Sequence, residues 1–380
     1  MRNLGLYLHI PFCVRKCAYC DFYSGAQGVE TRKRYAEALC KHLVAVAPRA
    51  KGFTVDTVYF GGGTPTLLDR EDFASILDTV RAHFAVEADA EITAECNPVT
   101  NAKGLMEGLL AAGVNRLSIG LQSANEDELK LLGRPHGYGE FLETYTAARR
   151  AGFDNVSVDL MFGIPSQTVE SFAHTIDTVV ALAPEHISAY GLRIEEGTPF
   201  DGMRNSLHFP SEDEEAEMAE LVADRLKNAG YEHYEISNYA RAGKRSRHNM
   251  RYWLGADYLG FGPTAHSYFE GARFETSPDL AAYLTAVEQG NFDSLWQNKT
   301  VIAGKEQMDE YVMLHMRLFD GIDLGDFSHR YGTFFENIYG DVTPLVQGGF
   351  LIKTADRLAF TERGMRVSNA ILADWLDFGN

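Results

Sequence analysis

The chain has 380 residues, of which 45% are hydrophobic and 23% charged, and its formal net charge is -18. This composition is typical of a globular protein with a sizeable core, and the excess of acids argues against a nucleic-acid partner, which needs clustered Lys and Arg. No apolar run approaches the roughly 20 residues of a membrane span. Because the first residues also lack the layout of a signal peptide, we expect a cytoplasmic protein without an integral membrane segment.

Short apolar segments alternate with helical patterns along the first two thirds of the chain. The segments with strand character are 4–10, 55–60, 90–95, 115–122, 155–162 and 186–190. Helical patterns follow them, for example at 70–83 and at 211–229, where Ser211 and Glu214 have the spacing of a capping box. Six such alternations predict an α/β fold with a parallel sheet, open or curled into a partial barrel. An α+β mixture with antiparallel pairs is the alternative.

The pattern of predicted helices and strands changes after about residue 295. A helix is predicted at roughly 304–319, and a two-strand wing and a closing helix follow, which predicts a small winged-helix-like α+β domain. Such modules often bind DNA, but this one has many acids and no basic stripe, so we favour packing or partner contact. The expected division is a partial barrel at 1–240, a segment packing on it at 241–295, and the C-terminal domain at 296–380.

Three of the five cysteines, Cys13, Cys17 and Cys20, lie directly after the first predicted strand with the spacing C-x-x-x-C-x-x-C. In a cytosolic chain, clustered cysteines indicate metal or redox chemistry rather than disulfides. Structural zinc takes four ligands, and no fourth Cys or His follows nearby. Three thiolates on a four-iron cluster would leave one iron open to a small molecule. We favour the 4Fe–4S cluster, with zinc or unrelated buried cysteines as alternatives; Cys40 and Cys96 fit small buried hydrophobes.

The motif CVRKCAYC, with an aromatic residue before its last cysteine, resembles that of the radical S-adenosylmethionine (SAM) superfamily. The resemblance implies a partial (β/α)6 barrel, in which the open iron of the cluster binds the methionine end of SAM. Polar residues at the carboxyl ends of successive predicted strands agree with this resemblance. Folds of this kind bind their ligands at the edge that these strand ends form. By resemblance, the residues that contact SAM are Tyr7, Tyr19, Gly62, Gly63, Thr64, Glu95, Gln122, Arg134, Asp159, Gly191 and His266.

The resemblance covers nearly the whole chain and narrows to the relatives of oxygen-independent coproporphyrinogen III oxidase. That oxidase has a further cysteine two positions after the third, where this chain has Phe22, and an N-terminal extension before its cluster. Both departures argue against decarboxylase activity. The motif H-N-x-x-Y-W resembles instead the signature of the haem chaperone branch, the HemW type. Its residues are His248, Asn249, Tyr252 and Trp253.

These residue types suit haem, because an imidazole can ligate iron and aromatic rings can pack against the macrocycle. His248 is the first candidate for the iron ligand, and an ordinary core histidine is the alternative. The other candidate ligands are His9, His136 and His266. Arg245 and Arg247 lie in a basic stretch at 241–251 and are candidate partners for the haem propionates, since charge-assisted hydrogen bonds are strong. The alternative is a solvated basic loop facing acids at 212–215 and 217.

The predicted function is therefore haem binding and transfer to acceptor haemoproteins, membrane-bound ones included, by a protein that carries a 4Fe–4S cluster and SAM. The resemblance implies that the cluster serves regulation, dimerisation or electron delivery, so that a homodimer is one expected assembly. No residue is assigned a catalytic role. A radical SAM decarboxylase acting on coproporphyrinogen III is the second hypothesis, and a radical SAM enzyme with another substrate is the third.

Overall fold

Across residues 2–98 and 102–376, which the computed structural model describes, six parallel strands form the centre of the main sheet. These strands are β1 (Arg2–Ile10), β2 (Phe53–Gly62), β3 (Val86–Cys96), β4 (Arg116–Gln122), β5 (Val156–Phe162) and β6 (His186–Gly191). Each pairs in parallel with the next one in the chain. The predicted parallel α/β architecture is thus confirmed, and the carboxyl ends of all these strands lie along one edge.

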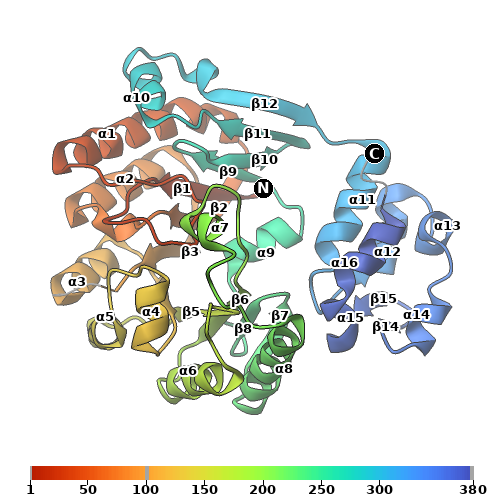
Figure 1. Ribbon diagram of the computed structural model, residues 1–380. Helices are drawn as coiled ribbons and strands as arrows, with labels where there is room; N and C mark the ends of the chain where they lie inside the picture. The colour runs from red at the N-terminus through yellow and green to blue at the C-terminus, as the bar shows by residue number, and fades with distance from the viewer. Residues whose placement is uncertain (1, 99–101, 377–380) are drawn as a thin grey trace.

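Helices connect the parallel strands or follow the last of them, and they cover the sheet (Figure 1). They are α1 (Val29–Val46), α2 (Arg70–His83), α3 (Ala102–Ala112), α4 (Glu126–Leu131), α5 (Tyr138–Ala151), α6 (Val169–Ala181), α7 (Pro199–Met203) and α8 (Glu212–Asn228), with the 3-10 turns η1 (Ala47–Ala50) and η2 (Pro65–Leu67). The predicted capping box of α8 is present, because Ser211 Oγ accepts from the Glu214 backbone N–H at 3.3 Å and Glu214 Oε2 accepts from that of Ser211 at 2.7 Å.

Additional short strands extend the main sheet at both edges, and the sequence did not predict them. They are β7 (Glu232–Glu235) and β8 (Asn238–Ala240) beside β6, and β9 (Tyr258–Phe261), β10 (His266–Phe269), β11 (Ala272–Thr276) and β12 (Trp296–Val301) beside β1. β9 is parallel to β1, and the others pair antiparallel. α9 (Arg247–Trp253) precedes β9, and α10 (Leu280–Glu288) and η3 (Phe292–Leu295) precede β12. These strands are too short for a clear alternation of apolar residues.

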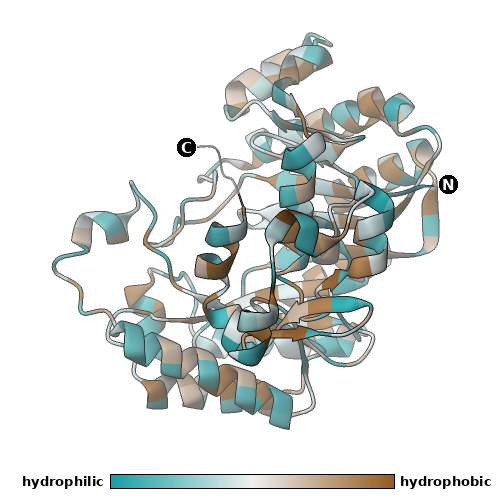
Figure 2. Cartoon of the chain, turned by 90° about the vertical axis from the view of Figure 1, so that its right-hand side faces the viewer, coloured by the Kyte–Doolittle hydropathy of each residue, from teal (hydrophilic) through white to brown (hydrophobic). Residues whose placement is uncertain are grey.

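The C-terminal part has a hydrophobic core of its own, which includes Val312, Phe327 and Leu358. Its elements are α11 (Gly304–His315), β13 (Ile322–Asp323), α12 (Leu324–Tyr331), α13 (Phe335–Tyr339), α14 (Thr343–Gln347), β14 (Leu351–Lys353), β15 (Arg357–Phe360), α15 (Glu362–Arg366) and α16 (Ser368–Trp375). β15 lies between β13 and β14 in an antiparallel sheet. Figure 2 shows helices that carry both hydrophobic and hydrophilic residues, which is expected of elements packed on one side. The small α+β domain with a wing is thus present.

The expected limits of the three parts of the chain stay a prediction. The strand that begins at Trp296 still belongs to the main sheet, and residues 1 and 377–380 lie outside the described residues. The C-terminal part contacts the barrel at β7, where the Phe319 backbone N–H donates to the Tyr234 carbonyl oxygen at 3.1 Å. In the described ranges, the helices are all too short or too polar to cross a bilayer.

Candidate functional site

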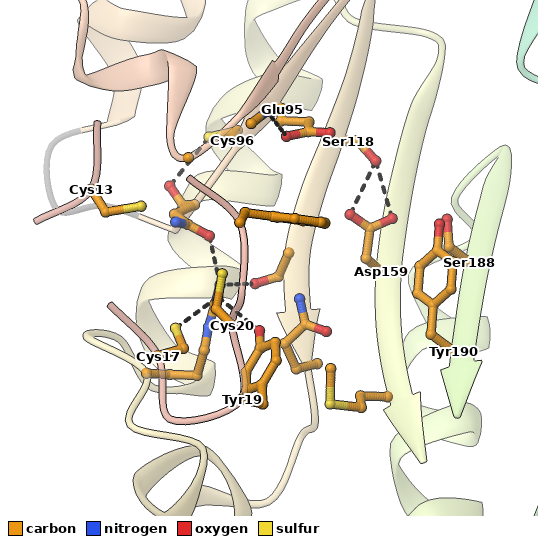
Figure 3. A pocket seen from close by; sticks show the side chains of 18 of the residues that line it. Cys13, Cys17, Tyr19, Cys20, Glu95, Cys96, Ser118, Asp159, Ser188 and Tyr190 are labelled. Carbon is orange, nitrogen blue, oxygen red and sulfur yellow. Dashed lines mark hydrogen bonds between the residues drawn. The ribbon is translucent and has the colours of Figure 1, made fainter. Parts of the chain in front are cut away.

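A cavity of about 400 Å³ opens at the carboxyl ends of the parallel strands. Many of the predicted site residues line it: Cys13, Cys17, Tyr19, Cys20, Gly62, Gly63, Glu95, Gln122, Arg134 and Asp159. Figure 3 shows Cys17, Tyr19 and Cys20 on one side of this cavity and Asp159, Ser188 and Tyr190 on the other. We call it the cysteine cavity. The fold therefore brings together residues that are far apart in the chain, from Cys13 to Asn249.

Backbone hydrogen bonds hold the loop that carries the three cysteines. The Cys13 N–H donates to the Gly25 carbonyl at 3.0 Å, and the Gly25 N–H donates to that of Pro11 at 3.1 Å, so the loop is closed at its base. On the far side, the Ala18 N–H donates to the Leu132 carbonyl at 2.9 Å. The cysteines themselves are free thiols. A loop fixed at both sides limits where the thiols can point.

The donor set of this loop fits a four-iron cluster. Within residues 2–98 and 102–376, there is no group of three or more His, Cys, Asp or Glu side chains placed to hold a single metal ion. A four-iron cluster takes each thiolate on a different iron, so its ligands do not have to converge on one point. The thiols that would bind the cluster are those of Cys13, Cys17 and Cys20, and their assignment stays a prediction. Burial raises the pKa of the Cys20 thiol, which a positive iron would offset.

Polar groups lie next to two of the sulfurs. Arg134 Nη1 donates to Cys17 Sγ at 3.5 Å, and the Thr64 hydroxyl lies 3.7 Å from Cys13 Sγ. Asn97 Nδ2 donates to that hydroxyl at 2.7 Å and so orients it. Hydrogen bonds to the sulfurs are one of the features that set the potential of an iron–sulfur cluster.

The glycine segment at the end of β2 packs directly on the cysteine loop. The Gly63 N–H donates to the Ile10 carbonyl at 2.9 Å, and the Thr64 N–H donates to that of Phe12 at 2.7 Å. A Cβ on Gly63 would lie 2.5 Å from the Phe12 carbonyl oxygen, which is far inside van der Waals contact. Gly62 has a φ of 114°, which favours glycine. Only glycine therefore lets β2 approach the cysteine loop this closely.

Glu95 at the end of β3 is a buried carboxylate that faces the same cavity. Its Oε1 accepts from the Tyr59 hydroxyl at 2.9 Å, and its Oε2 accepts from the Gly62 N–H at 3.1 Å. Burial, together with the negative charge of Asp159, raises the pKa of Glu95 to about 7. A cationic ligand group beside Glu95 would favour its ionised form, which agrees with the predicted place of the SAM ammonium.

Arg134 connects two strand ends to the cysteine loop. Besides its contact with Cys17, its Nη2 donates to Asn97 Oδ1 at 2.6 Å and to the Gly120 carbonyl oxygen at 2.7 Å. Its Nε is buried and has no hydrogen-bond partner among the described residues. A buried guanidinium with an unused N–H suits an anionic ligand group such as a carboxylate.

Gln122 at the end of β4 and Asp159 within β5 also line the cysteine cavity. Gln122 has a φ of 75°, which is uncommon for a residue other than glycine. The Ser118 hydroxyl donates to both oxygens of Asp159, at 3.0 and 3.1 Å, and burial raises the pKa of Asp159. The sequence reasoning missed Arg116 and Ser188, which also line the cavity. Both lie within predicted strands, but a polar residue inside a strand gives no signal of its own.

A second cavity, of about 940 Å³, adjoins the first, and we call it the aromatic cavity. Its lining includes Tyr7, Phe22, Tyr23, Tyr59, Tyr190, Tyr252, Trp253 and Tyr258. Asn249, from α9, lines both cavities, as do Phe22, Tyr59, Glu95 and Tyr190. The structure thus places three of the four residues of the H-N-x-x-Y-W motif, together with Tyr7 and His266, around a space beside the cysteines. Gly191 lines a different cavity, of about 660 Å³.

The structure corrects the expected position of His248. Its side chain is fully buried, and its Nδ1 and Nε2 lie 2.9 Å from the Thr57 Oγ1 and the Tyr252 hydroxyl, respectively. Burial lowers the pKa of His248 to about 3, so that the ring is neutral. In this arrangement neither nitrogen is free for iron, and His248 instead has the contacts of the alternative, a core histidine.

Arg245 and Arg247 also lie away from the aromatic cavity, against the prediction that they meet haem propionates. Arg245 pairs with Glu232 and Asp320, both at 2.5 Å. Arg247 lies 3.5 Å from Glu87 and 3.7 Å from Asp89. These acids, rather than the acids at 212–215 and 217 of the alternative, balance the basic stretch. Sequence reasoning missed them because Glu87 and Asp89 lie on β3, far away in the chain.

His9 and His136 were further candidates for the iron ligand. His9 lines the aromatic cavity but is almost fully buried. His136 is buried next to Arg134, and burial together with that positive charge lowers its pKa to about 3. His136 is absent from the described lining of both the cysteine cavity and the aromatic cavity. His266 lies at the start of β10, where its side chain is 70% exposed.

Comparison with protein families gives two matches. Residues 7–179 match the model of the radical SAM superfamily, and residues 302–367 match that of the HemN C-terminal domain. The first match contains the end of β1, the cysteine loop and β2–β5. The second lies within the small C-terminal α+β domain. Both agree with the division of the chain into a barrel and a C-terminal part, although neither sets its limits.

Curated relatives match almost the whole chain. The "Heme chaperone HemW" of Bacillus subtilis is 32% identical and aligns over 97% of this chain and 98% of its own length. Its namesake in Escherichia coli is 35% identical, with 97% of each chain covered. The radical S-adenosyl methionine domain-containing protein 1, mitochondrial, of Danio rerio is 31% identical over 96% of this chain and 83% of its own.

One solved structure with a similar fold is coproporphyrinogen III oxidase (HemN) from Escherichia coli, which is described as a radical SAM enzyme. It superposes with a TM-score of 0.85 over 98% of this chain and 90% of that chain, at 25% sequence identity. The superposition covers the barrel and the C-terminal domain alike, so that the whole architecture is shared.

Proposed function

The chain belongs to the HemW family of haem chaperones within the radical SAM superfamily, and we propose that it binds haem and transfers it to acceptor haemoproteins. Membership of the superfamily implies a 4Fe–4S cluster and SAM. The observation that carries the proposal is the aromatic cavity, which is lined by residues of the H-N-x-x-Y-W motif and adjoins the cysteine cavity.

The aromatic cavity has the properties that a tetrapyrrole requires. Its volume of about 940 Å³ lies within the range of roughly 300–1,000 Å³ that is usual for ligand pockets. Aromatic rings such as those of Tyr252 and Trp253 offer flat apolar surface for the macrocycle, and their polar atoms can meet its edge. Burial of the apolar surface of the macrocycle against these rings would contribute most of the free energy of haem binding.

The cysteine cavity would hold the cluster and SAM. Cys13, Cys17 and Cys20 would bind three irons, and the cluster supplies one-electron chemistry when it is bound. Arg134 would bind the carboxylate of SAM and Glu95 its ammonium group, since Arg134 has a buried N–H without a partner among the described residues and Glu95 accepts from the glycine segment beside the cysteine loop. The chain's own part is thus to bind and orient SAM next to the aromatic cavity, and we assign no bond-breaking step to it.

Coproporphyrinogen III oxidation is the second candidate function, and the similarity to HemN over both domains favours it. Phe22 argues against it, because this residue replaces the further cysteine that the oxidase has by resemblance. Phe22 is 62% exposed and lines both cavities. An exposed apolar ring at that place extends the aromatic wall, which suits a flat apolar ligand.

One preparation separates the two functions. The protein is reconstituted with iron and sulfide without oxygen, and haem is titrated by the Soret absorbance. In parallel, coproporphyrinogen III and SAM are added with a reductant, and decarboxylated product is measured. We expect saturable, roughly equimolar haem binding and no product. Turnover of the porphyrinogen, or haem absorbance that does not saturate, would contradict the proposal.

A further inference from the structure

The two histidines in the described lining of the aromatic cavity, His9 and His266, differ in what their rings contact. His9 Nδ1 lies 3.1 Å from the Tyr7 hydroxyl, and its Nε2 lies 3.0 Å from the Tyr23 carbonyl oxygen. Since both nitrogens of His9 are engaged and the side chain is buried, a metal could reach it only by breaking those contacts. The same holds for His248 behind the cavity wall.

His266 lines the aromatic cavity with an exposed ring. Its side chain is 70% exposed, and it has a carboxylate partner, with Nε2 3.5 Å from Glu275 Oε2. The register of β10 and β11 sets this pair, because His266 lies directly opposite Glu275 and opposed residues share one face of a sheet. A slightly closer approach would let the Nε2–H donate to this carboxylate, and a hydrogen bond of that kind orients an imidazole whose other nitrogen binds a metal. Nδ1 is therefore the nitrogen left for a metal.

The backbone around His266 is closely fixed. Gly260 on β9 lies so near that a Cβ there would be 2.2 Å from the His266 carbonyl oxygen. The Gly260 N–H also donates to the Ser267 hydroxyl at 2.9 Å. Thr264, which lines the cavity two residues earlier, has a φ of 60°. Only a glycine at 260 permits this packing, which fixes the backbone from which the His266 side chain extends.

We propose that His266 ligates the iron of haem in the aromatic cavity through Nδ1, with Glu275 as its positioning residue. The inference rests on the proposed function and deepens it. It assigns the iron ligand to His266 and not to His248 of the H-N-x-x-Y-W motif. The ring of His248 supports the wall from behind, through its contacts with Thr57 and Tyr252, while the iron ligand comes from the adjacent β10 strand.

Four variants test the proposal: His266→Ala, Glu275→Gln, His248→Ala and, as a control, His174→Ala. His174 is exposed on α6 and is absent from the described lining of both cavities. Each variant is titrated with haem and examined by Soret absorbance and by electron paramagnetic resonance of the ferric complex. SAM binding is measured on the same preparations. We expect His266→Ala to shift the Soret band and to weaken haem binding at least about tenfold, with partial rescue by added imidazole. Glu275→Gln should give a smaller shift, and His174→Ala none.

Different results would overturn the proposed function or only the assignment of His266 as the iron ligand. Wild-type protein without saturable haem binding overturns the proposed function and this inference with it. Wild-type binding that His266→Ala leaves unchanged, in affinity and in spectrum, overturns the inference alone. So does a His266→Ala variant that loses SAM binding but keeps the wild-type haem spectrum, because His266 then contacts SAM. If His248→Ala unfolds the protein, the His266→Ala and Glu275→Gln spectra still decide.

Discussion

Arg134 donates a hydrogen bond to the Sγ of Cys17 across 117 positions of the chain. The same guanidinium binds Asn97 Oδ1 and the Gly120 carbonyl, so it joins the cysteine loop to the ends of β3 and β4. The loop that would hold the cluster and the strand ends that would hold SAM are thus not independent. A substitution of Arg134 should therefore affect both the cluster and the binding of SAM.

Arg134→Lys should therefore weaken SAM binding and change the cluster. Lysine keeps the charge but cannot make the several directed contacts of the guanidinium. Charge-assisted hydrogen bonds are worth about 1.5–3 kcal/mol each, which corresponds to a loss of roughly tenfold or more in SAM affinity. Equilibrium dialysis with SAM and the reduction potential of the cluster measure the two effects. Arg150→Lys, at an exposed position in the last turn of α5, is the matched control. Unchanged SAM affinity in Arg134→Lys would contradict the assigned role.

Gly63→Ala should disrupt the cysteine loop. The added methyl group would meet the Phe12 carbonyl oxygen at 2.5 Å, and a backbone atom held by the Thr64 N–H cannot move away cheaply. We expect a loss of about 1–3 kcal/mol in stability, as for other overpacked sites, together with a lower yield of cluster on reconstitution. Chemical denaturation and iron content measure these effects. Gly139→Ala is the control, because a Cβ there meets nothing within 4 Å and lies within α5; equal effects of the two changes would refute the explanation.

The parallel strands and the cysteine loop could be predicted because their signals are local in the sequence. Apolar runs mark β1 to β6, and the spacing of Cys13, Cys17 and Cys20 is contained in eight residues. The short strands β9 to β12 could not be predicted in this way. Each gains its place by pairing with a neighbour, and its own residues show no clear period.

The roles of single polar residues depend on contacts that the sequence does not contain. His248 stands in a motif that suits haem, yet its Nδ1 lies against Thr57, which is 191 positions away on β2. Arg245 looks like an unbalanced cation in the sequence, but Asp320 of the C-terminal part lies beside it. Conversely, the carboxylate next to His266 follows from strand register alone. The sequence could thus indicate the kind of site, but the orientation of its side chains needed the fold.

Cys17→Ala should remove the cluster without removing haem binding. Cys17 lines the cysteine cavity and is absent from the described lining of the aromatic cavity. We expect the broad iron–sulfur absorbance to be lost after reconstitution, while the haem affinity stays within about threefold of the wild type. Cys40→Ala is the control, since Cys40 packs on the core beside α2, with its Sγ 4.0 Å from Ser75 Oγ. A Cys17→Ala variant with a normal cluster would contradict the ligand assignment.

The affinity for SAM should depend on pH through Glu95. Burial raises the pKa of this carboxyl group from 4.5 to about 7 in the absence of ligand, so that it is largely neutral below pH 7. An ammonium group bound beside it favours the ionised form, and binding then requires loss of the proton. We therefore expect affinity to be highest at about pH 7–8 and to fall below pH 7, by up to about tenfold for each pH unit, as Glu95 takes up its proton; above about pH 8 it falls again as the ammonium group loses its own.

Glu95→Gln isolates this effect, because glutamine keeps the size of the side chain and does not titrate. The variant should bind SAM more weakly at pH 8, and its affinity should stay flat down to pH 6. Stability without ligand changes in the opposite sense: the folded state keeps its proton up to about pH 7 and the unfolded state only to about pH 4.5, so stability falls as pH rises between these values. Calorimetric titration with SAM from pH 6 to 8.5 compares the two proteins. A wild-type affinity that is independent of pH, or a Glu95→Gln variant with the same pH profile as the wild type, would show that this carboxylate does not bind the ammonium group.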